Sequence, residues 1–263
     1  MHWRSRLNLA ISDNNKTGLY AHKSNKIIEI DQCLIAVKKI NNSKVFKEIW
    51  KNKDKLSLSV SSENEINISQ KGKTIYGSNE LNEVVENLNY KISPNSFWQS
   101  HIKAPSLILK QINKYAKINF GDIVCDLYGG SGLFTYQISK LIGNNGKVHL
   151  IERDNACIKN AKKMFQNTKN IVIHHGKVEQ KIEKIKKINT IILDPPRSGA
   201  SKKVINQIIK KKPNSIIYIS CNPASLARDS KILTENNYKL NNLVGLDLFP
   251  MTQHIECVAS FSK

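Results

Sequence analysis

From residue 94 onward, the chain alternates short apolar runs with longer amphipathic segments. Short apolar runs bounded by turn residues are typical of buried strands, whereas apolar residues at every third or fourth position are typical of amphipathic helices. Regular alternation of the two predicts an α/β domain, in which helices cover both faces of a mainly parallel sheet. The expected strands are residues 123–127, 147–151, 170–174, 190–193, 216–219, 242–247 and 255–261, and the expected helices are residues 104–117, 133–141, 155–165, 178–187, 202–211 and 224–235.

The segment before this region has a different pattern. Short stretches in which apolar and polar residues alternate are separated by polar turn residues, which is typical of an antiparallel sheet. These stretches are residues 3–11, 18–22, 26–30, 56–60 and 65–69, and the last two are expected to form a hairpin. We therefore expect a small β-rich domain over residues 1–90 and an α/β domain over residues 91–263.

The composition is that of a globular protein, with 263 residues, of which 40% are hydrophobic and 24% charged. No apolar run reaches the ~18 residues that a membrane span needs, and the first residues lack the apolar core of a signal peptide. We expect a cytoplasmic, monomeric protein without a membrane partner.

The cysteines favour reduced thiols. There are five, an odd number, at scattered positions and without a Cys-x-x-Cys pair. This pattern argues against a disulfide framework and against a self-contained zinc site. We therefore expect no bound metal.

The formal charge of +20 and the isoelectric point near 9.7 favour a polyanionic partner. Lysine and arginine side chains that contact phosphates release condensed counterions, so a large positive excess is typical of nucleic-acid binding. The alternative is drift in an AT-biased genome, which also enriches lysine, asparagine and isoleucine. An excess of this size favours RNA or DNA over a small neutral substrate.

The segment Ser220-Cys221-Asn222-Pro223 follows an apolar strand and precedes a helical pattern. Chemistry in α/β sheets gathers at the carboxyl ends of the strands. A thiol at a helix amino terminus is expected to have a lowered pKa, because the helix dipole stabilises the thiolate. Cys221 is therefore a candidate nucleophile, and a buried structural thiol is the alternative.

A glycine-rich turn, Asp-Leu-Tyr-Gly-Gly-Ser-Gly over residues 126–132, follows the first strand of the α/β region. Glycines let the backbone approach a ligand closely, and an acidic residue at the end of the next strand, here Glu152, can bind ribose hydroxyls. The turn lacks the lysine of a phosphate-binding loop. A nucleoside cofactor without phosphates, such as S-adenosylmethionine, fits better, and a simple structural turn is the alternative.

Two further strand ends carry acidic residues. Asp194-Pro195-Pro196-Arg197 ends the strand at residues 190–193, and its prolines hold Asp194 at the ligand edge of the sheet. Glu256 lies among apolar neighbours in the last strand, where an unpaired carboxylate is costly, so it is a candidate general base. Pairing of Glu256 with a lysine is the alternative, and His254 is expected to be a hydrogen-bonded surface imidazole.

Five motifs occur together, in an order that resembles the RNA uracil-C5 methyltransferase family, which makes 5-methyluridine in tRNA or 23S rRNA. They are Phe-Trp-Gln at 97–99, the glycine turn at 126–132, Asp-Pro-Pro-Arg-Ser-Gly at 194–199, Ser-Cys-Asn-Pro at 220–223 with Ala-Arg-Asp at 227–229, and Phe-Pro-Met-Thr-Gln-His-Ile-Glu at 249–256. The resemblance extends from Trp3 to the end of the chain. It implies a Rossmann-like class I methyltransferase sheet behind a small β-rich domain.

The resemblance also implies roles for individual residues. Cys221 would add to C6 of uracil, so that C5 becomes nucleophilic and takes the methyl group of S-adenosylmethionine, and Glu256 would then remove the C5 proton. The target base would have to leave its stack. The positions that match cofactor contacts in the family are Gln99, Tyr128, Glu152 and Asp194, to which the glycine turn adds Gly130.

The sequence departs from the family in two places. His101 stands where family members commonly have asparagine, and Cys33 resembles only the last of four iron–sulfur ligands, so no iron–sulfur cluster is expected. The amino-terminal RNA-binding barrel of the family is also not expected in this chain. Two other hypotheses stay open, an amino-methyltransferase that uses the Asp-Pro-Pro loop and an RNA-binding protein without catalytic activity.

Overall fold

The computed structural model describes residues 1–263, which form two compact units, Met1–Ala104 and Pro105–Lys263. The boundary falls later than the expected one after residue 90. The reason is that the segment after residue 92 hydrogen-bonds back to the start of the chain. Arg6 Nη1 donates to the carbonyls of Pro94 and Ser96, and the Ile102 amide donates to the Trp3 carbonyl. The Arg6 guanidinium is therefore part of the framework of the first unit.

The first unit contains a six-stranded antiparallel sheet in the order β3-β2-β1-β4-β5-β6 and a separate hairpin, β7-β8. The alternating pattern predicted β1 to β5, but β6 and the β7-β8 hairpin were not predicted. Two short helical segments, α1 (Lys38–Asn41) and η1 (Lys44–Phe46), cover the apolar face of the sheet. The strands are β1 (Arg6–Ile11), β2 (Thr17–Tyr20), β3 (Ile27–Glu29), β4 (Leu56–Val60), β5 (Ile66–Gln70), β6 (Lys73–Gly77), β7 (Leu81–Val85) and β8 (Leu88–Ile92).

The second unit has a seven-stranded sheet in the order β11-β10-β9-β12-β13-β15-β14. Strands β9 to β13 are parallel, and β15 runs antiparallel to both β13 and β14. The α/β fold predicted from strand–helix alternation is confirmed. The strands are β9 (Ile123–Leu127), β10 (Lys147–Glu152), β11 (Ile171–His175), β12 (Thr190–Leu193), β13 (Ser215–Ser220), β14 (Lys239–Leu246) and β15 (Glu256–Ser262).

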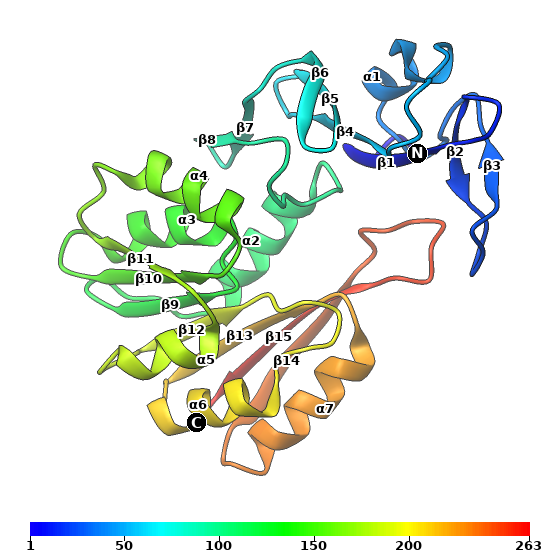
Figure 1. Cartoon of the computed structure of the whole chain (residues 1–263). Coiled ribbons are helices and arrows are strands. Elements are labelled where there is room, and N and C mark those ends of the chain that lie inside the picture. Colours follow the sequence, from blue (N-terminus) through cyan, green and yellow to red (C-terminus); the bar gives the residue numbers. More distant parts are fainter. The chain divides into compact units, whose positions relative to one another are not determined.

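Helices cover both faces of this sheet (Figure 1), with α3 and α4 on one face and α5, α6 and α7 on the other. Side chains of Asp154, Ser201 and Asn222 cap the amino termini of α4, α6 and α7. The helix expected at residues 178–187 is shorter, because α5 passes into a 3-10 turn, η2 (Ile182–Lys184). The helices are α2 (Ala104–Tyr115), α3 (Leu133–Ile142), α4 (Asn155–Phe165), α5 (Val178–Lys181), α6 (Lys202–Lys211) and α7 (Pro223–Thr234).

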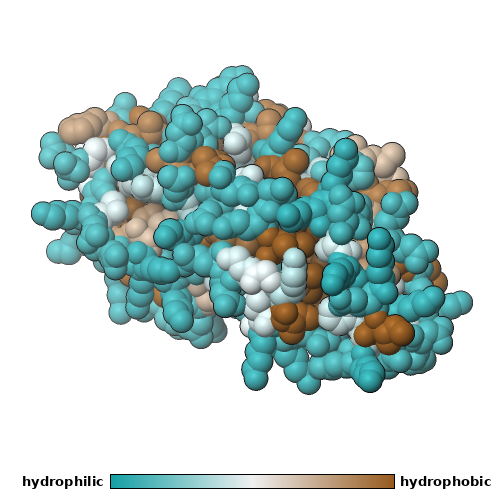
Figure 2. Space-filling view, turned by 90° about the horizontal axis from the view of Figure 1, so that it is seen from above, coloured by the Kyte–Doolittle hydropathy of each residue, from teal (hydrophilic) through white to brown (hydrophobic).

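The order of strands reverses between β9 and β12, which places a topological switch at the carboxyl ends of these strands, where α/β sheets bind ligands. No helix combines the length and the apolar character that crossing a membrane requires. The face of the molecule in Figure 2 is mostly hydrophilic, with hydrophobic residues in separate small groups. This surface agrees with the lysine-rich composition.

Candidate active site

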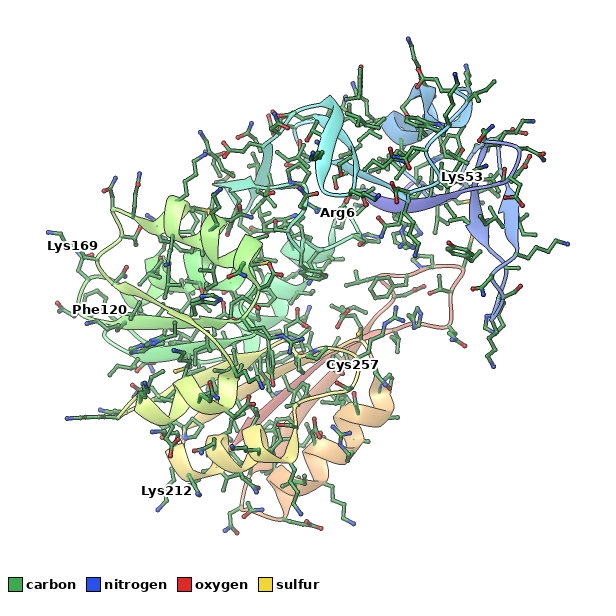
Figure 3. The ribbon with its side chains drawn as sticks, viewed as in Figure 1. Arg6, Lys53, Phe120, Lys169, Lys212 and Cys257 are labelled. Carbon is green, nitrogen blue, oxygen red and sulfur yellow. The ribbon has the colours of Figure 1, made fainter.

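The antiparallel pairing of β13 with β15 brings Cys221 and Glu256 together. Ser220, the last residue of β13, is the register partner of Cys257, so the next position on each strand holds Cys221 and Glu256. Figure 3 labels Cys257 at this end of β15. The Cys221 thiol is half-buried, and the Glu256 side chain is only 4% exposed. A thiol and a carboxyl from distant parts of the sequence therefore share one edge of the sheet.

The surroundings of the Glu256 carboxyl favour its protonated form. Burial raises its pKa to about 8, and the nearby Asp194 charge adds to the effect. Its Oε1 atom has no hydrogen-bond partner. The lysine pairing that the sequence left open is therefore not what the structure shows. A buried carboxyl with a free oxygen is suited to proton transfer near neutral pH.

The pKa of the Cys221 thiol is raised, which corrects the lowered pKa expected from its place before a helix. Burial is the main cause, followed by the charges of Glu256 and Asp194, and these effects outweigh the opposing charge of Arg197. The helix does begin here, because the Asn222 side chain accepts a hydrogen bond from the Ala224 amide. Burial, reinforced by the charges of the two carboxylates, therefore raises the pKa of this thiol.

Asp194 follows β12, which pairs in parallel with β13, and its charge acts on both Cys221 and Glu256. The Asp194 amide donates to the Leu127 carbonyl, which ties this loop to the end of β9. Asp194 and Cys221 therefore lie at the carboxyl ends of two neighbouring parallel strands. The cofactor role of Asp194 stays a prediction.

The glycine turn is bonded to Glu152 at the end of β10. The Gly130 amide donates to Glu152 Oε2 at 3.1 Å, while Oε1 accepts from the amides of Arg153 and Asp154. Tyr128 and Gly130 both have left-handed backbones, with φ of 61° and 55°. This conformation turns the chain sharply after β9 and directs the Gly130 amide toward the neighbouring strand.

This turn has the features that a nucleoside cofactor requires. No atom lies within 4 Å of the position that a Cβ on Gly130 would take, so the backbone is open to a ligand there. Glu152 Oε2 accepts only one hydrogen bond within the protein, which leaves a lone pair for a ribose hydroxyl. Asp126, fully buried below the turn, bonds to Thr135 through Oδ2 and keeps Oδ1 without a partner. Burial raises its pKa to about 7.

A buried network behind the site was not predicted from the sequence. The Asp229 carboxylate accepts from the Tyr218 hydroxyl at 2.6 Å, from the Ala200 amide at 2.9 Å and from Arg228 at 2.7 and 2.8 Å. Arg228 Nη2 also donates to the Ser198 carbonyl. These bonds join the loop that follows Asp194 to α7, the helix that follows Cys221. In the sequence, the Ala-Arg-Asp motif at residues 227–229 was the only indication of this network.

Loop residues near the thiol form a second contact. Arg197 Nη2 donates to His254 Nε2 at 3.4 Å, and the His254 ring lies edge-on to Phe249, with centroids 6.2 Å apart. The expectation of a hydrogen-bonded imidazole is consistent with this geometry. The contact links the Asp-Pro-Pro-Arg loop to the segment that leads into β15.

Gln99 lies in the first unit, between β8 and α2, and is half-buried. Its role as a cofactor contact stays a prediction. His101, which stands where the family commonly has asparagine, stacks on Trp3 with ring centroids 5.4 Å apart and accepts from the Lys103 amide. Cys33 is buried, and no group of three or more histidine, cysteine or acidic side chains is arranged to hold a metal ion.

Comparison with known proteins adds relatives of similar sequence. An uncharacterised RNA methyltransferase of Streptomyces avermitilis is 27% identical over 287 residues, which cover 98% of this chain and 66% of that protein. An uncharacterised RNA methyltransferase of Fusobacterium nucleatum is 33% identical over 260 residues, which cover 96% of this chain and 53% of that protein. The chain thus spans about half to two thirds of the length of these curated relatives.

The solved structure of Pyrococcus abyssi tRNA (uracil-54, C5)-methyltransferase, in complex with S-adenosyl-L-homocysteine, has the same fold. Its TM-score is 0.77 at 22% sequence identity, and the match covers 99% of this chain and 76% of that one. The second unit therefore has the class I methyltransferase fold. The sequence profile of the family described as tRNA (uracil-5-)-methyltransferase matches residues 43–263. Because that match covers most of the sequence, this chain belongs to the tRNA (uracil-5-)-methyltransferase family.

Proposed function

We propose that this protein transfers a methyl group from S-adenosylmethionine to C5 of a uridine in tRNA or rRNA. Membership of the family supports the reaction class, and the pairing of Cys221 with the buried, unpartnered Glu256 Oε1 supports the mechanism. A methyltransferase that acts on an exocyclic nitrogen needs neither group. The thiol and the carboxyl at the ends of two paired strands are therefore the observation that carries the proposal.

Uracil C5 is a poor nucleophile, and the proposed role of Cys221 is to change that. The Cys221 thiol first loses its proton to solvent, and the thiolate forms a bond from Sγ to C6 while the electron pair of the C5–C6 bond moves toward C5 and the O4 carbonyl. Bound S-adenosylmethionine supplies the electrophilic methyl group that C5 takes. Glu152 and the open backbone at Gly130 would hold the nucleoside part of this cofactor.

The adduct breaks down when the C5 proton leaves. Glu256 in its ionised form takes this proton, the C5–C6 double bond forms again, and Sγ leaves C6 as thiolate. A carboxylate with an ordinary pKa is a weak base for a carbon acid, whereas a pKa of about 8 gives Glu256 a higher proton affinity. Burial, which raises this pKa, therefore suits Glu256 to the step.

The Asp229 network supports the geometry of both steps. The network joins the loop that follows Asp194 to α7, the helix that follows Cys221. It thereby fixes the loop of Asp194, the carboxylate whose charge acts on Cys221 and Glu256. A fixed site lowers the cost of bringing thiol, base and target carbon together.

The experiment that tests this function is covalent trapping. The protein is mixed with S-adenosylmethionine and RNA that contains 5-fluorouridine, and the products are separated on a denaturing gel. Fluorine at C5 cannot leave as a proton, so a thiolate adduct on C6 should persist. We expect a slow-migrating complex with the wild-type chain and with Glu256→Gln, and none with Cys221→Ala.

Two results would contradict the proposal. Methylation of unsubstituted RNA by Cys221→Ala at the wild-type rate would rule out the covalent mechanism. The second result is that the wild-type chain binds S-adenosylmethionine but forms no adduct. The protein would then be one that binds RNA without catalysing this methylation. Digestion of the methylated RNA to nucleosides identifies 5-methyluridine directly.

A further inference from the structure

A polar cleft lies at the end of the second unit away from Cys221. Its volume is about 340 Å³, and it opens between the amino ends of β12 and β13 and the segment that leads into β9. Amide, hydroxyl and lysine side chains dominate its wall. They are Lys114, Lys117, Asn119, Asn189, Thr190, Asn214, Ser215, Asn241, Asn242, Ser260 and Ser262, with Asp122 as the acidic member. Such a wall suits a ligand rich in hydroxyl groups and phosphates.

Exposed lysines stand along the same edge of the sheet as this cleft. They stand in the loops that enter the parallel strands, at the carboxyl ends of helices and at the last residue of the chain. Acidic residues are few at this edge, namely Asp122, Glu183 and Glu235. The lysines are Lys114, Lys117, Lys147, Lys169, Lys184, Lys186, Lys187, Lys210, Lys212, Lys239 and Lys263. We call these lysines, the cleft and Phe120 the amino-edge surface.

Phe120 gives this surface an aromatic group. Its side chain is 68% exposed, although its ring packs against Gly143, where a Cβ would lie 2.1 Å from the ring. The Gly121 amide bonds to the Ile142 carbonyl and fixes the loop. An exposed, fixed ring is a platform on which a nucleobase can stack.

Two hydrogen bonds join the loops on either side of Phe120 and Gly143 to segments that carry lysines. The Lys147 amide donates to the Asp122 carbonyl, and the Asn170 side chain, next to Lys169, donates to the Gly143 carbonyl. Figure 3 shows Phe120, Lys169 and Lys212 at the end of the second unit away from Cys257. The ring and its cationic neighbours thus belong to the edge opposite the thiol.

The edge is held rigid by side chains that bond to its backbone. Lys211 Nζ donates to the carbonyls of Glu183 and Ile185, and the Tyr238 hydroxyl donates to the Pro213 carbonyl. Asn189 bonds to Ile123 through its amide and its side chain. The loops that carry the lysines are therefore preorganised, which lowers the entropic cost of binding.

We propose that the amino-edge surface binds a single-stranded segment of the RNA, with a base on Phe120 and phosphates on the surrounding lysines. This inference rests on the proposed function only in taking RNA as the substrate. Strand β13 has six residues, so the surface lies roughly 20 Å from Cys221 along the sheet. A folded RNA is large enough to reach both edges, which makes this site a second anchor remote from the target uridine.

The test measures binding of fluorescein-labelled oligouridylate by fluorescence anisotropy at several KCl concentrations, without S-adenosylmethionine. The variants are Phe120→Ala and the triple Lys117→Ala, Lys147→Ala and Lys169→Ala. We expect Phe120→Ala to weaken binding at least about fivefold, because base stacking is lost. The triple variant should reduce the slope of log K against log[KCl] by about 2, since each phosphate contact on a single strand contributes roughly 0.7.

Two controls separate this site from general charge and from folding. A matched triple, Lys159→Ala, Lys162→Ala and Lys231→Ala, removes the same charge from exposed helix positions and should change the slope much less. Phe120→Trp keeps an aromatic platform and should bind at least as tightly as the wild type. Equal effects of both lysine triples, or unchanged binding by Phe120→Ala, would overturn the proposal.

The same variants distinguish this inference from the proposed function. If the wild-type chain forms no 5-fluorouridine adduct but its RNA binding depends on Phe120, the catalytic proposal fails and the amino-edge surface stands. If the adduct forms at the wild-type rate at saturating RNA and binding is indifferent to Phe120, the amino-edge surface fails and the catalytic proposal stands.

Discussion

The Tyr218 hydroxyl donates a hydrogen bond of 2.6 Å to Asp229 Oδ2 inside the second unit. Tyr218 lies on β13, three positions before Cys221, and Asp229 lies on α7, the helix that follows Cys221. The same oxygen accepts from the Ala200 amide, beyond the Asp-Pro-Pro-Arg loop. One carboxylate therefore joins the strand, the helix and the loop that surround the thiol.

Replacing Tyr218 with phenylalanine removes this donor without changing the volume of the side chain. We expect the free energy of unfolding to fall by about 1–3 kcal/mol, because a buried acceptor loses a partner. We also expect slower adduct formation at saturating RNA, because the loop that carries Asp194 is held less firmly. Denaturant unfolding and the rate of 5-fluorouridine trapping measure the two effects.

The control is Tyr238→Phe, because Tyr238 is equally buried and donates to the Pro213 carbonyl at the opposite edge of the sheet. It should cost similar stability and leave the trapping rate at saturating RNA unchanged. Equal loss of trapping rate in both variants would mean that Tyr218 acts only through global stability.

Gly199 tests the network from the loop side. Its backbone φ is +78°, and a Cβ there would lie 2.7 Å from both Arg228 Nη2 and Asp229 Oδ2. We expect Gly199→Ala to be more destabilising than Gly121→Ala, where φ is +83° and no atom is within 4 Å. The Gly121 variant should cost only the left-handed backbone strain, about 1–2 kcal/mol. Denaturant unfolding of the two variants gives the comparison. Equal losses in the free energy of unfolding would show that Arg228 and Asp229 can move aside at little cost.

Much of the second unit was predictable because its local signals agree with each other. Strands 123–127 and 190–193 and helices 155–165 and 202–211 have the expected bounds, and the caps Asp154 and Ser201 mark the two helix starts. The family resemblance is also confirmed. By contrast, β6 was not predicted, because almost all of Lys73–Gly77 is exposed and its residues lack a regular apolar alternation.

The electrostatics of the site were not predictable from neighbours in the sequence. The helix after Cys221 suggested a lowered thiol pKa, but burial and the charges of Glu256 and Asp194 raise it. Those carboxylates come from β15 and from the end of β12, and only the paired register brings them to the thiol. The sequence motifs identified Cys221, Glu256 and Asp194, but they did not reveal that the two carboxylates raise the pKa of the thiol.

The raised pKa of Cys221 can be tested by alkylation with iodoacetamide as a function of pH. The reactive thiolate should appear at a higher pH than for an ordinary thiol, because burial and the Glu256 charge oppose ionisation. Glu256→Gln should move the midpoint to lower pH, whereas Glu235→Gln, at the exposed end of α7, should not. Cys221→Ser gives the background of the other four cysteines, which are buried. An unchanged midpoint in Glu256→Gln would show that the carboxyl and the thiol do not interact.

Glu256 should also make stability depend on pH. Its pKa rises from 4.5 to about 8 in the folded protein, so between these values the folded state holds a proton that the unfolded state has released. Stability from this group is therefore lost as pH rises through this window, and the loss is complete above about pH 8. The Glu256→Gln variant has no charge to bury. Above pH 8 its free energy of unfolding should therefore exceed that of the wild type by on the order of 3–5 kcal/mol. Below pH 5 most of this difference should disappear. Urea unfolding of both proteins at several pH values measures the difference, and a difference that does not change with pH would mean that Glu256 is ionised in the folded protein at neutral pH.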